Sequence, residues 1–240
     1  MMKNIRIVLI NTSHPGNIGA AARAMKTMGL TELYLVQPLN FPHPKAHEMA
    51  SNAGDVVDQA IVVDSLDAAI KDCELVVGTS TRSRTIPWPI LTPREFAEKA
   101  RIETLNAKVA VLFGREQSGL TNEELHRCHF HIHIPSNQEY SSLNLASAVQ
   151  VIAYELCVAS LDEKKEVTPL NWDYQWANAE QMESFYEHLR QVLVELDFLK
   201  PEAPRQLMTR LRRLFHRARL DVMELNILRG ILGAVSKQKK

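Results

Sequence analysis

Short apolar runs alternate with amphipathic stretches along the first 161 residues of the chain. Apolar and β-branched residues predict buried strands at Ile5–Ile10, Leu33–Val36, Ala60–Val63, Glu74–Gly78, Lys108–Phe113 and His129–Ile134. Helical patterns between them predict helices at Asn17–Met28, at 45–50, from Ser65 to Lys71 and at Ser142–Leu161. Capping boxes at Thr92–Glu95 and Thr121–Glu124 start two more helices. This alternation predicts an α/β fold, a parallel sheet with helices on both faces.

The pattern changes after Leu161. A charged and then aromatic segment, with Trp172, Tyr174 and Trp176, has no clear period and predicts a linker. Three helical patterns follow, near 180–198, 204–219 and 222–236. We therefore expect an α/β domain over residues 1–161, a linker over 162–179, and a small all-α extension over 180–240.

Composition narrows the class of protein. Apolar residues make up 45% of the 240 residues and charged residues 23%, which is typical of a globular protein. No stretch is long and apolar enough to cross a bilayer, and the first residues lack the apolar segment of a signal peptide. The three cysteines, Cys73, Cys128 and Cys157, are scattered, which favours a reducing compartment. We expect a cytoplasmic protein that does not contact a membrane.

The net charge of zero hides a strong asymmetry. Residues 200–240 hold eleven Lys or Arg against three Asp or Glu, a net charge of +8, so the preceding residues carry −8. Arg210, Arg213 and Arg217 share one helical face, while leucines and Phe215 lie on another. A solvated basic face is the simpler interpretation, but this arrangement favours an anionic partner, and we expect RNA.

Several common sites are disfavoured. The chain has neither the phosphate-binding loop G-x-x-x-x-G-K-[ST] nor the dinucleotide fingerprint G-x-G-x-x-G after its first strand. His129, His131 and His133 alternate along one predicted strand, and such spacing can hold a metal. No acidic ligand is evident near them, and a buried sheet face offers no open coordination position, so we expect no metal.

Three segments at predicted strand ends carry glycine, serine or isolated charges. They are Asn17-Ile18-Gly19-Ala20-Ala21-Ala22-Arg23-Ala24, Phe113-Gly114-Arg115-Glu116-Gln117-Ser118-Gly119-Leu120, and Ile134-Pro135-Ser136-Asn137 with Tyr140-Ser141-Ser142-Leu143-Asn144-Leu145. Taken singly, they suit an alanine-rich packing helix, a surface turn and an ordinary helix cap. Ligands of parallel sheets bind at the carboxyl ends of the strands, which is where all three segments fall.

Taken together, and in this order, the three segments resemble the three motifs of the SPOUT RNA methyltransferases. The resemblance covers residues 1–161. The segment Thr79-Ser80-Thr81-Arg82-Ser83-Arg84, then Pro87-Trp88-Pro89 and the helical C-terminal extension, resemble one bacterial branch of that family. The resemblance implies methyl transfer to the ribose 2′-hydroxyl of the anticodon-loop nucleotide at position 32 of tRNA, a cytidine or uridine.

The resemblance also implies structure and a cofactor. In the family the last third of the α/β domain forms a trefoil knot, S-adenosyl-L-methionine binds in a bent form within the knot loops, and two chains associate as a homodimer. Carried over to this chain, the cofactor-binding residues are Thr79, Ser80, Thr81, Gly114, Ile134, Ser141, Ser142 and Leu143. Glycine at position 114 would let the backbone approach the cofactor closely.

Residues for catalysis and RNA binding follow from the same resemblance. Arg23 is expected near the ribose hydroxyl, where it positions the hydroxyl and a phosphate because guanidinium is a poor base. Glu116 is expected to orient an arginine or backbone, and Asn17 and Asn144 to fix the substrate side of the cavity. The arginines expected to contact RNA phosphates are Arg82, Arg84, Arg115, Arg210, Arg213 and Arg217.

Two other classes of protein remain open at this point. One is an RNA-binding relative without catalytic activity, against which the intact motif residues argue. The other is an α/β oxidoreductase or another nucleotide-binding enzyme, against which the missing glycine fingerprint argues. DNA is not an expected partner.

Overall fold

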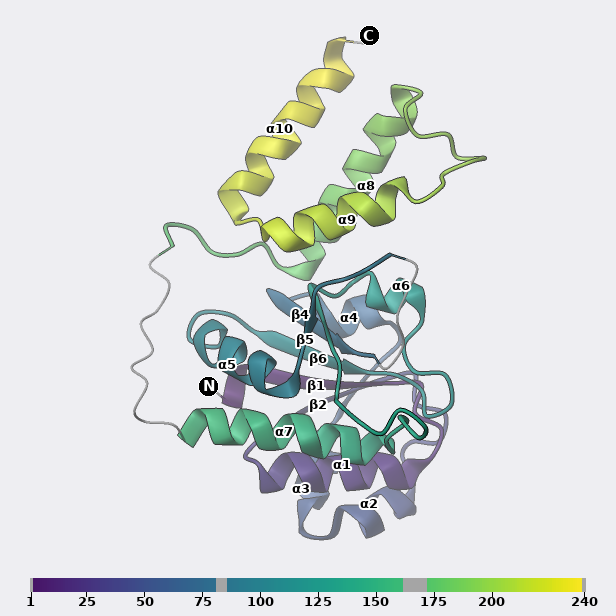
Figure 1. Ribbon diagram of the computed structural model, residues 1–240, viewed down its shortest axis with the longest axis vertical. Coiled ribbons are helices and arrows are strands. Elements are labelled where there is room, and N and C mark those ends of the chain that lie inside the picture. The colour runs from purple at the N-terminus through teal and green to yellow at the C-terminus, as the bar shows by residue number, and fades with distance from the viewer. Residues whose placement is uncertain (1, 81–85, 162–171, 239–240) are drawn as a thin grey trace.

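A single parallel sheet forms the centre of the molecule (Figure 1). Within residues 2–80, 86–161 and 172–238, which the computed structural model describes, seven strands pair in the order β3-β2-β1-β6-β4-β7-β5. They are β1 (Ile5–Ile10), β2 (Glu32–Val36), β3 (Ile61–Val63), β4 (Leu75–Thr79), β5 (Ile90–Leu91), β6 (Val109–Phe113) and β7 (Phe130–Ile132). Each pairing is parallel. All their carboxyl ends therefore lie at one edge.

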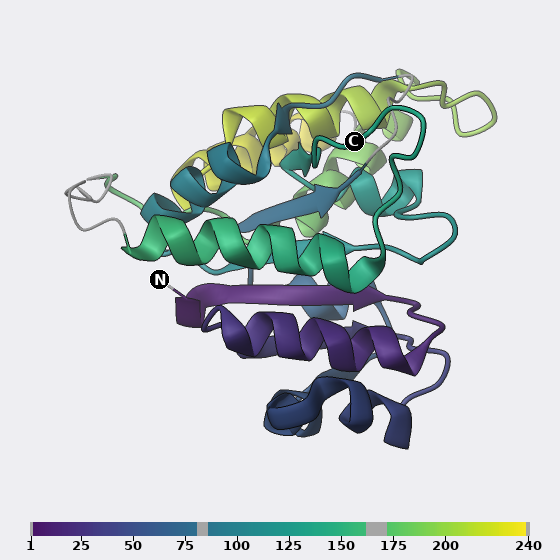
Figure 2. The same ribbon diagram turned by 60° about the horizontal axis from the view of Figure 1, so that its bottom comes forward.

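Helices cover both faces of the sheet (Figure 2). On one face, α1 (Pro15–Thr27), α5 (Pro93–Glu103) and α7 (Leu145–Leu161) share a core with the strands, and α2 (Pro44–Ala50) and α3 (Gly54–Asp58) pack against α1. On the other face lie the short helices α4 (Leu66–Ile70) and α6 (Asn122–Leu125). The predicted α/β architecture is confirmed.

Three further helices form a C-terminal unit with a core of its own. They are α8 (Ala179–Glu195), α9 (Leu207–Ala218) and α10 (Val222–Gln238). Phe185 and Tyr186 of α8 are almost completely buried, and Phe215 of α9 packs edge-on against Phe185. Asp221 caps α10, since its Oδ1 accepts the N–H of Glu224.

The C-terminal unit is docked on the α/β domain through polar and aromatic contacts. The Ala179 N–H donates to the carbonyl of Cys73 at 3.0 Å. Arg219, at the end of α9, pairs with the buried carboxylate of Glu103 at the end of α5. The His216 ring meets His129 edge-on, with 4.6 Å between ring centroids. The docking surface therefore combines an ion pair with neutral rings.

Most predicted elements are observed, with differences where local patterning is weak. Both predicted capping boxes and the Ser65 cap are present. The sequence missed β5, which has two residues and so no readable period, and α3, in the poorly patterned segment 40–58. It also began α7 three residues early, at Ser142 rather than Leu145.

Some expectations about architecture stay predictions. The trefoil knot and the domain boundaries at 161 and 179 are two of these, and residues 162–171 of the predicted linker lie outside the described part of the chain. Trp172 and Trp176, at the end of that linker, stack with 5.1 Å between ring centroids, and the Trp172 indole N–H donates to Asp221. Among the described residues, no helix is long and apolar enough to cross a membrane.

Candidate active site

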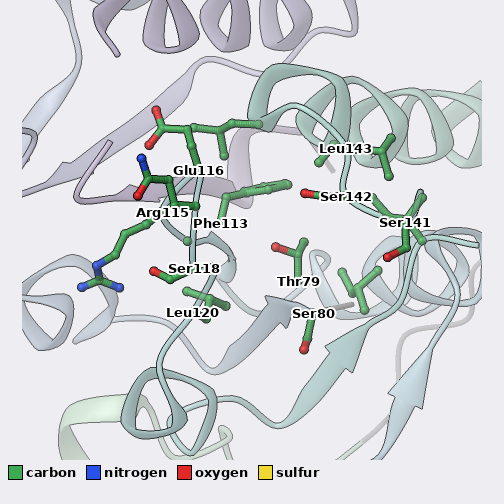
Figure 3. A pocket seen from close by; sticks show the side chains of 17 residues that line it. Thr79, Ser80, Phe113, Arg115, Glu116, Ser118, Leu120, Ser141, Ser142 and Leu143 are labelled. Carbon is green, nitrogen blue, oxygen red and sulfur yellow. The ribbon is translucent and has the colours of Figure 1, made fainter. Parts of the chain in front are cut away.

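A cavity of about 340 Å³ opens at the carboxyl edge of the sheet (Figure 3). Its walls come from the end of β4, the loop after β6, the end of β7 and the segment that leads into α7. Cavities for small organic ligands start at about 300 Å³. In a parallel sheet this edge is where ligands bind, because the connecting loops converge there.

Most of the residues predicted to bind a cofactor line this cavity. Those found in the lining are Thr79, Ser80, Gly114, Ile134, Ser141, Ser142 and Leu143. Thr81 lies outside the described residues. Sequence analysis missed several further lining residues, namely Phe113, Gln117, Ser118, Gly119, Leu120, Ile132, Leu145 and Ala148. All but Ile132 and Ala148 lie within the three segments that the sequence had already singled out, so those segments were the signal that could have found them.

The cavity lining divides into hydroxyl groups and apolar walls. Thr79, Ser80, Ser141 and Ser142 supply hydroxyls, and Figure 3 places the labelled Thr79 between Phe113 and Ser141. The Thr79 hydroxyl also donates to the Leu112 carbonyl at 3.0 Å. Isoleucine and leucine side chains complete the walls. A lining of this kind suits a flat, partly apolar ligand with ribose-like hydroxyls.

Gly114 has a structural role within its own loop, in addition to the predicted one. A Cβ at position 114 would lie 2.1 Å from the backbone carbon of Gly119 and 2.3 Å from the Leu120 nitrogen. The loop closes at this point, where the Arg115 and Gly119 backbones exchange two hydrogen bonds of 3.2 and 2.9 Å. Glycine is therefore required for the loop to fold back on itself, and the sequence-based reason, close approach of a cofactor, is not needed to explain it.

A chain of hydrogen bonds joins Glu116 to the two residues expected at the substrate side of the cavity. The Asn144 amide donates to Asn17 Oδ1 at 3.0 Å, and the Asn17 amide donates to Glu116 Oε1 at 3.0 Å. Glu116 also accepts from the Ser13 and His14 N–H groups, each at 3.2 Å. Glu116 thus orients the backbone at the start of α1, one of its two predicted roles.

The electrostatics of Glu116 favour the ionised form. Partial burial on its own would raise the pKa of this carboxyl, but the hydrogen bonds from Asn17 and from the Ser13 and His14 backbone outweigh it and hold the pKa below its usual value. A carboxylate stabilised in this way is a weak base. Glu116 therefore suits positioning better than removal of a proton.

The segment directly before α7 has no regular secondary structure. Because α7 begins at Leu145, Ser141 and Ser142 are not in its first turn, and the predicted serine-rich helix start is wrong. Asn144 caps the helix instead, since its Oδ1 accepts the N–H of Ala146 at 2.9 Å. The Asn144 side chain therefore fixes the start of α7 and reaches Asn17 as well.

The predicted arginines lie in several different environments. Arg23 is exposed on α1 and does not line the cavity. Arg115 is paired with Glu124 of α6 at 3.0 Å. Arg210 and Arg217 are exposed on α9, and Arg213 donates to the Pro87 carbonyl at 3.0 Å. Arg82 and Arg84 lie outside the described residues.

The three alternating histidines do not form a common cluster. His129 and His131 are buried, whereas His133 is exposed. Trp88 stacks on His131 with 5.6 Å between ring centroids, and its indole N–H donates to Cys128 at 2.8 Å. Among the residues that the structure describes, no group of three His, Cys, Asp or Glu side chains is arranged to hold a metal ion.

Comparison with known proteins identifies the class. Residues 4–154 match the model of the SpoU rRNA Methylase family, and residues 180–240 match the model described as tRNA methyltransferase TrmJ, C-terminal domain. The chain belongs to the SpoU methylase family, and the predicted resemblance is confirmed.

Over its full length the chain is similar to particular members of that family. It is 54% identical to the tRNA (cytidine/uridine-2′-O-)-methyltransferase TrmJ of Pectobacterium atrosepticum, over 99% of this chain and 98% of that protein. A TrmJ of Yersinia pestis is 53% identical, over 100% and 94%. The crystal structure of TrmJ from Z. mobilis ZM4 superposes with a TM-score of 0.84 at 32% identity, covering 96% of this chain and 98% of that one.

Proposed function

We propose that this protein transfers a methyl group from S-adenosyl-L-methionine to the ribose 2′-hydroxyl of the anticodon-loop nucleotide at position 32 of tRNA, cytidine or uridine. The observation that carries the proposal is the cavity at the carboxyl edge of the sheet, bordered by the hydrogen-bonded chain Glu116–Asn17–Asn144. The full-length similarity to enzymes named for this reaction supports the substrate.

The cavity residues fit this cofactor chemically. The hydroxyls of Thr79, Ser80, Ser141 and Ser142 suit the ribose and amino acid groups, and the apolar walls at Ile132, Ile134 and Leu143 suit the adenine ring. When bound, the cofactor supplies a methyl group already activated by a positively charged sulfur. The protein itself must therefore align the two reactants rather than activate the methyl group.

Alignment is the task of the residues around the cavity. Holding a nucleophile and its target in position lowers the barrier by about 7–11 kcal/mol in favourable cases. Asn17 and Asn144 hold the substrate side, since Asn144 donates to Asn17 and Asn17 in turn donates to Glu116. Arg23 positions the ribose hydroxyl and the adjoining phosphate. The hydroxyl proton passes to an RNA phosphate or to water, because guanidinium stays protonated.

The protein acts as a homodimer with a knotted α/β domain. An apolar strip on α7 supports association: Tyr154, Val158 and Leu161 follow one another at helical spacing and are 51%, 39% and 72% exposed. Arg23 does not line the cavity of its own chain. In a homodimer it could act at the cavity of the partner chain instead. The free cysteines Cys73, Cys128 and Cys157 agree with a place in the cytoplasm.

The RNA-binding surface includes the arginines of the C-terminal unit. Arg210 and Arg217 are exposed on α9, and Arg213 lies between them on the same side of the helix. Arg82 and Arg84, outside the described residues, stay predicted phosphate contacts. Since phosphate contacts are shared by all sequences, these arginines provide affinity rather than choice of nucleotide.

One assay tests substrate, reaction and position together. Labelled S-adenosyl-L-methionine is incubated with unmodified tRNA, and the products are analysed as nucleosides. We expect label in 2′-O-methylcytidine or 2′-O-methyluridine of the anticodon loop. Label on a base would overturn the reaction, and bound cofactor without any transfer would indicate an RNA-binding relative without catalysis.

Arg23→Ala tests the proposed catalytic arginine in the same assay. We expect methyl transfer to be abolished, while binding of the cofactor product S-adenosylhomocysteine stays near that of the unchanged protein. Near-normal turnover by this variant would remove Arg23 from the mechanism.

A further inference from the structure

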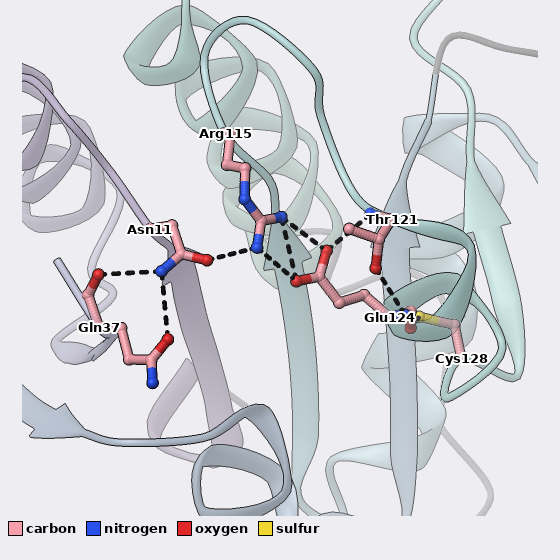
Figure 4. A network of polar contacts seen from close by, with 6 residues as sticks. All are labelled: Asn11, Gln37, Arg115, Thr121, Glu124 and Cys128. Atoms are coloured by element: carbon pink, nitrogen blue, oxygen red, sulfur yellow. Dashed lines mark hydrogen bonds and ion pairs between the residues drawn. The ribbon is translucent and has the colours of Figure 1, made fainter. Parts of the chain in front are cut away.

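The Arg115 side chain is bonded to two other side chains of the protein, Glu124 and Asn11. In Figure 3 its guanidinium points away from Thr79 and Ser142. Both terminal nitrogens lie 3.0–3.1 Å from the Glu124 carboxylate, and Nη2 also donates to Asn11 Oδ1 (Figure 4). The Arg115 side chain is only 30% exposed and that of Glu124 13%. A phosphate could engage these nitrogens only by displacing a carboxylate already bonded to both of them.

The partners of Arg115 are themselves fixed. Glu124 accepts the N–H of Thr121 at 2.7 Å in the capping box of α6. Asn11 follows β1 with a left-handed backbone, φ 47°, and its amide donates to the Gln37 carbonyl at 3.1 Å. The group Arg115, Glu124, Asn11 and Gln37, which we call the Arg115 clamp, therefore ties together the ends of three strands and the start of α6.

The Arg115 clamp fixes one end of the loop 115–119, which lines the cavity. Arg115 is the first residue of the loop 115–119, and its backbone pairs with Gly119 to close that loop. Glu116, Gln117, Ser118 and Gly119 all line the cavity. The side chain of Arg115 anchors one end of the loop, while the next residue, Glu116, bonds the segment Ser13–Asn17. Two adjacent residues thus hold the loop against the segment that follows β1.

We propose that Arg115 and Glu124 are positioning residues for the methyl-transfer site: their ion pair fixes the loop 115–119 in the conformation that accepts the cofactor, and Arg115 does not contact RNA. The inference rests on the proposed function, because it assigns the cavity to S-adenosyl-L-methionine. If the ion pair positions the loop, replacing either Arg115 or Glu124 should have the same effect on cofactor binding. A phosphate contact through Arg115 would predict an effect for Arg115 alone.

Two measurements on the full-length protein test the clamp. The first is the Kd for S-adenosylhomocysteine by titration calorimetry, with no RNA present. The second is the slope of log K against log salt for tRNA binding. The variants are Arg115→Gln, Arg115→Lys and Glu124→Gln, with Arg94→Gln as control because Arg94 also pairs with a glutamate but is 73% exposed on α5.

We expect all three clamp variants to weaken S-adenosylhomocysteine binding by about tenfold or more, since a small displacement of positioned groups is costly. Lysine should not rescue, because one ammonium cannot replace the planar fork on Glu124. The salt slope should stay unchanged for Arg115→Gln and Glu124→Gln, and Arg94→Gln should change neither quantity. Glutamine at 124 still suits a capping box, which guards against simple misfolding.

The opposite pattern of results would contradict the positioning role proposed for the Arg115 clamp. If Arg115→Gln lowers the salt slope by about one and leaves the S-adenosylhomocysteine Kd unchanged, Arg115 contacts a phosphate. If Glu124→Gln binds the ligand normally, the ion pair does not position the loop. The unchanged protein separates this failure from that of the proposed function: if it does not bind S-adenosylhomocysteine at all, the cofactor assignment falls and the clamp with it.

Discussion

Glu116 illustrates how one carboxylate can organise a site without taking part in proton transfer. Its two oxygens accept from the Ser13 N–H and hydroxyl, from the His14 N–H and from the Asn17 amide. All of these partners are donors, and both oxygens of the ionised carboxylate act as acceptors. A proton added to either oxygen would therefore displace one of these hydrogen bonds. The sequence identified Glu116 as a motif residue, but its donors lie about 100 positions away in the chain and only folding brings them together.

Replacing Glu116 by glutamine should disrupt this arrangement. The new NH₂ group would face donors on one side and repel them, so the start of α1 and Asn17 would shift. We expect kcat/KM for methyl transfer to fall by about 100-fold. The measurement is steady-state methyl transfer to tRNA, with Glu123→Gln, an exposed acidic residue of α6, as control. Equal activity of the two variants would show that Glu116 does not position the site.

At the scale of elements, the local sequence predicts where a helix starts more reliably than it predicts what the helix packs against. Ser65, Thr92 and Thr121 cap their helices as predicted, because a cap depends on residues three positions apart. The start of α7 was mispredicted because Asn144, a good cap, stands just after the serines that also favour a cap. Neither β5 nor α3 could be predicted: β5 exists only through pairing with β7, and α3 packs on α1.

Two glycines in helices provide a matched test of packing against propensity. A Cβ at Gly19 would lie 1.9 Å from the Ala46 carbonyl oxygen, so Gly19→Ala should push α2 away from α1 and destabilise by about 1–3 kcal/mol. A Cβ at Gly230 in α10 would meet nothing within 4 Å, so Gly230→Ala should stabilise by about 0.5–1 kcal/mol. Urea unfolding measures both, and shifts of the same sign would contradict the packing argument.

For the whole molecule, the cavity could be predicted as a set of segments but not as a shape. Parallel strands bring the loops after β4, β6 and β7 to one edge, which the alternating pattern already implied. The docking of the C-terminal unit could not be predicted, because it depends on single contacts between residues distant in the chain, such as that between His216 and His129. Such contacts leave no trace in the periodic pattern of apolar and polar residues.

The buried histidines at this docking surface predict an acid-sensitive stability. Burial, and then the nearby Arg212, Arg127 and His126, lower the pKa of His216 to about 3, and burial also lowers the pKa of His129. The unfolded chain, with an ordinary histidine pKa of about 6.5, binds a proton first. The stability that comes from a neutral His216 is therefore present above about pH 6.5 and is lost as the pH falls toward 3.

Unfolding by urea at pH 7.5 and 5.5 checks this prediction. His216→Phe keeps a ring at the position and removes the titration. We expect the free energy of unfolding to drop on acidification by about 1 kcal/mol less in this variant than in the unchanged protein. His188→Phe, the same replacement at a partly buried histidine of α8, is the control. An identical pH dependence in all three proteins would contradict the role of His216.

The pairing of Glu103 with Arg219 makes the two units of the protein depend on each other. Glu103 belongs to the α/β domain and is 6% exposed, yet its charge is met by an arginine of the C-terminal unit as well as by Lys99 beside it. In an α/β domain that stood alone, Glu103 would keep Lys99 as an ion-pair partner and lose Arg219. The charge balance at the end of α5 is therefore shared between the two units, and neither surface is complete when they are separated.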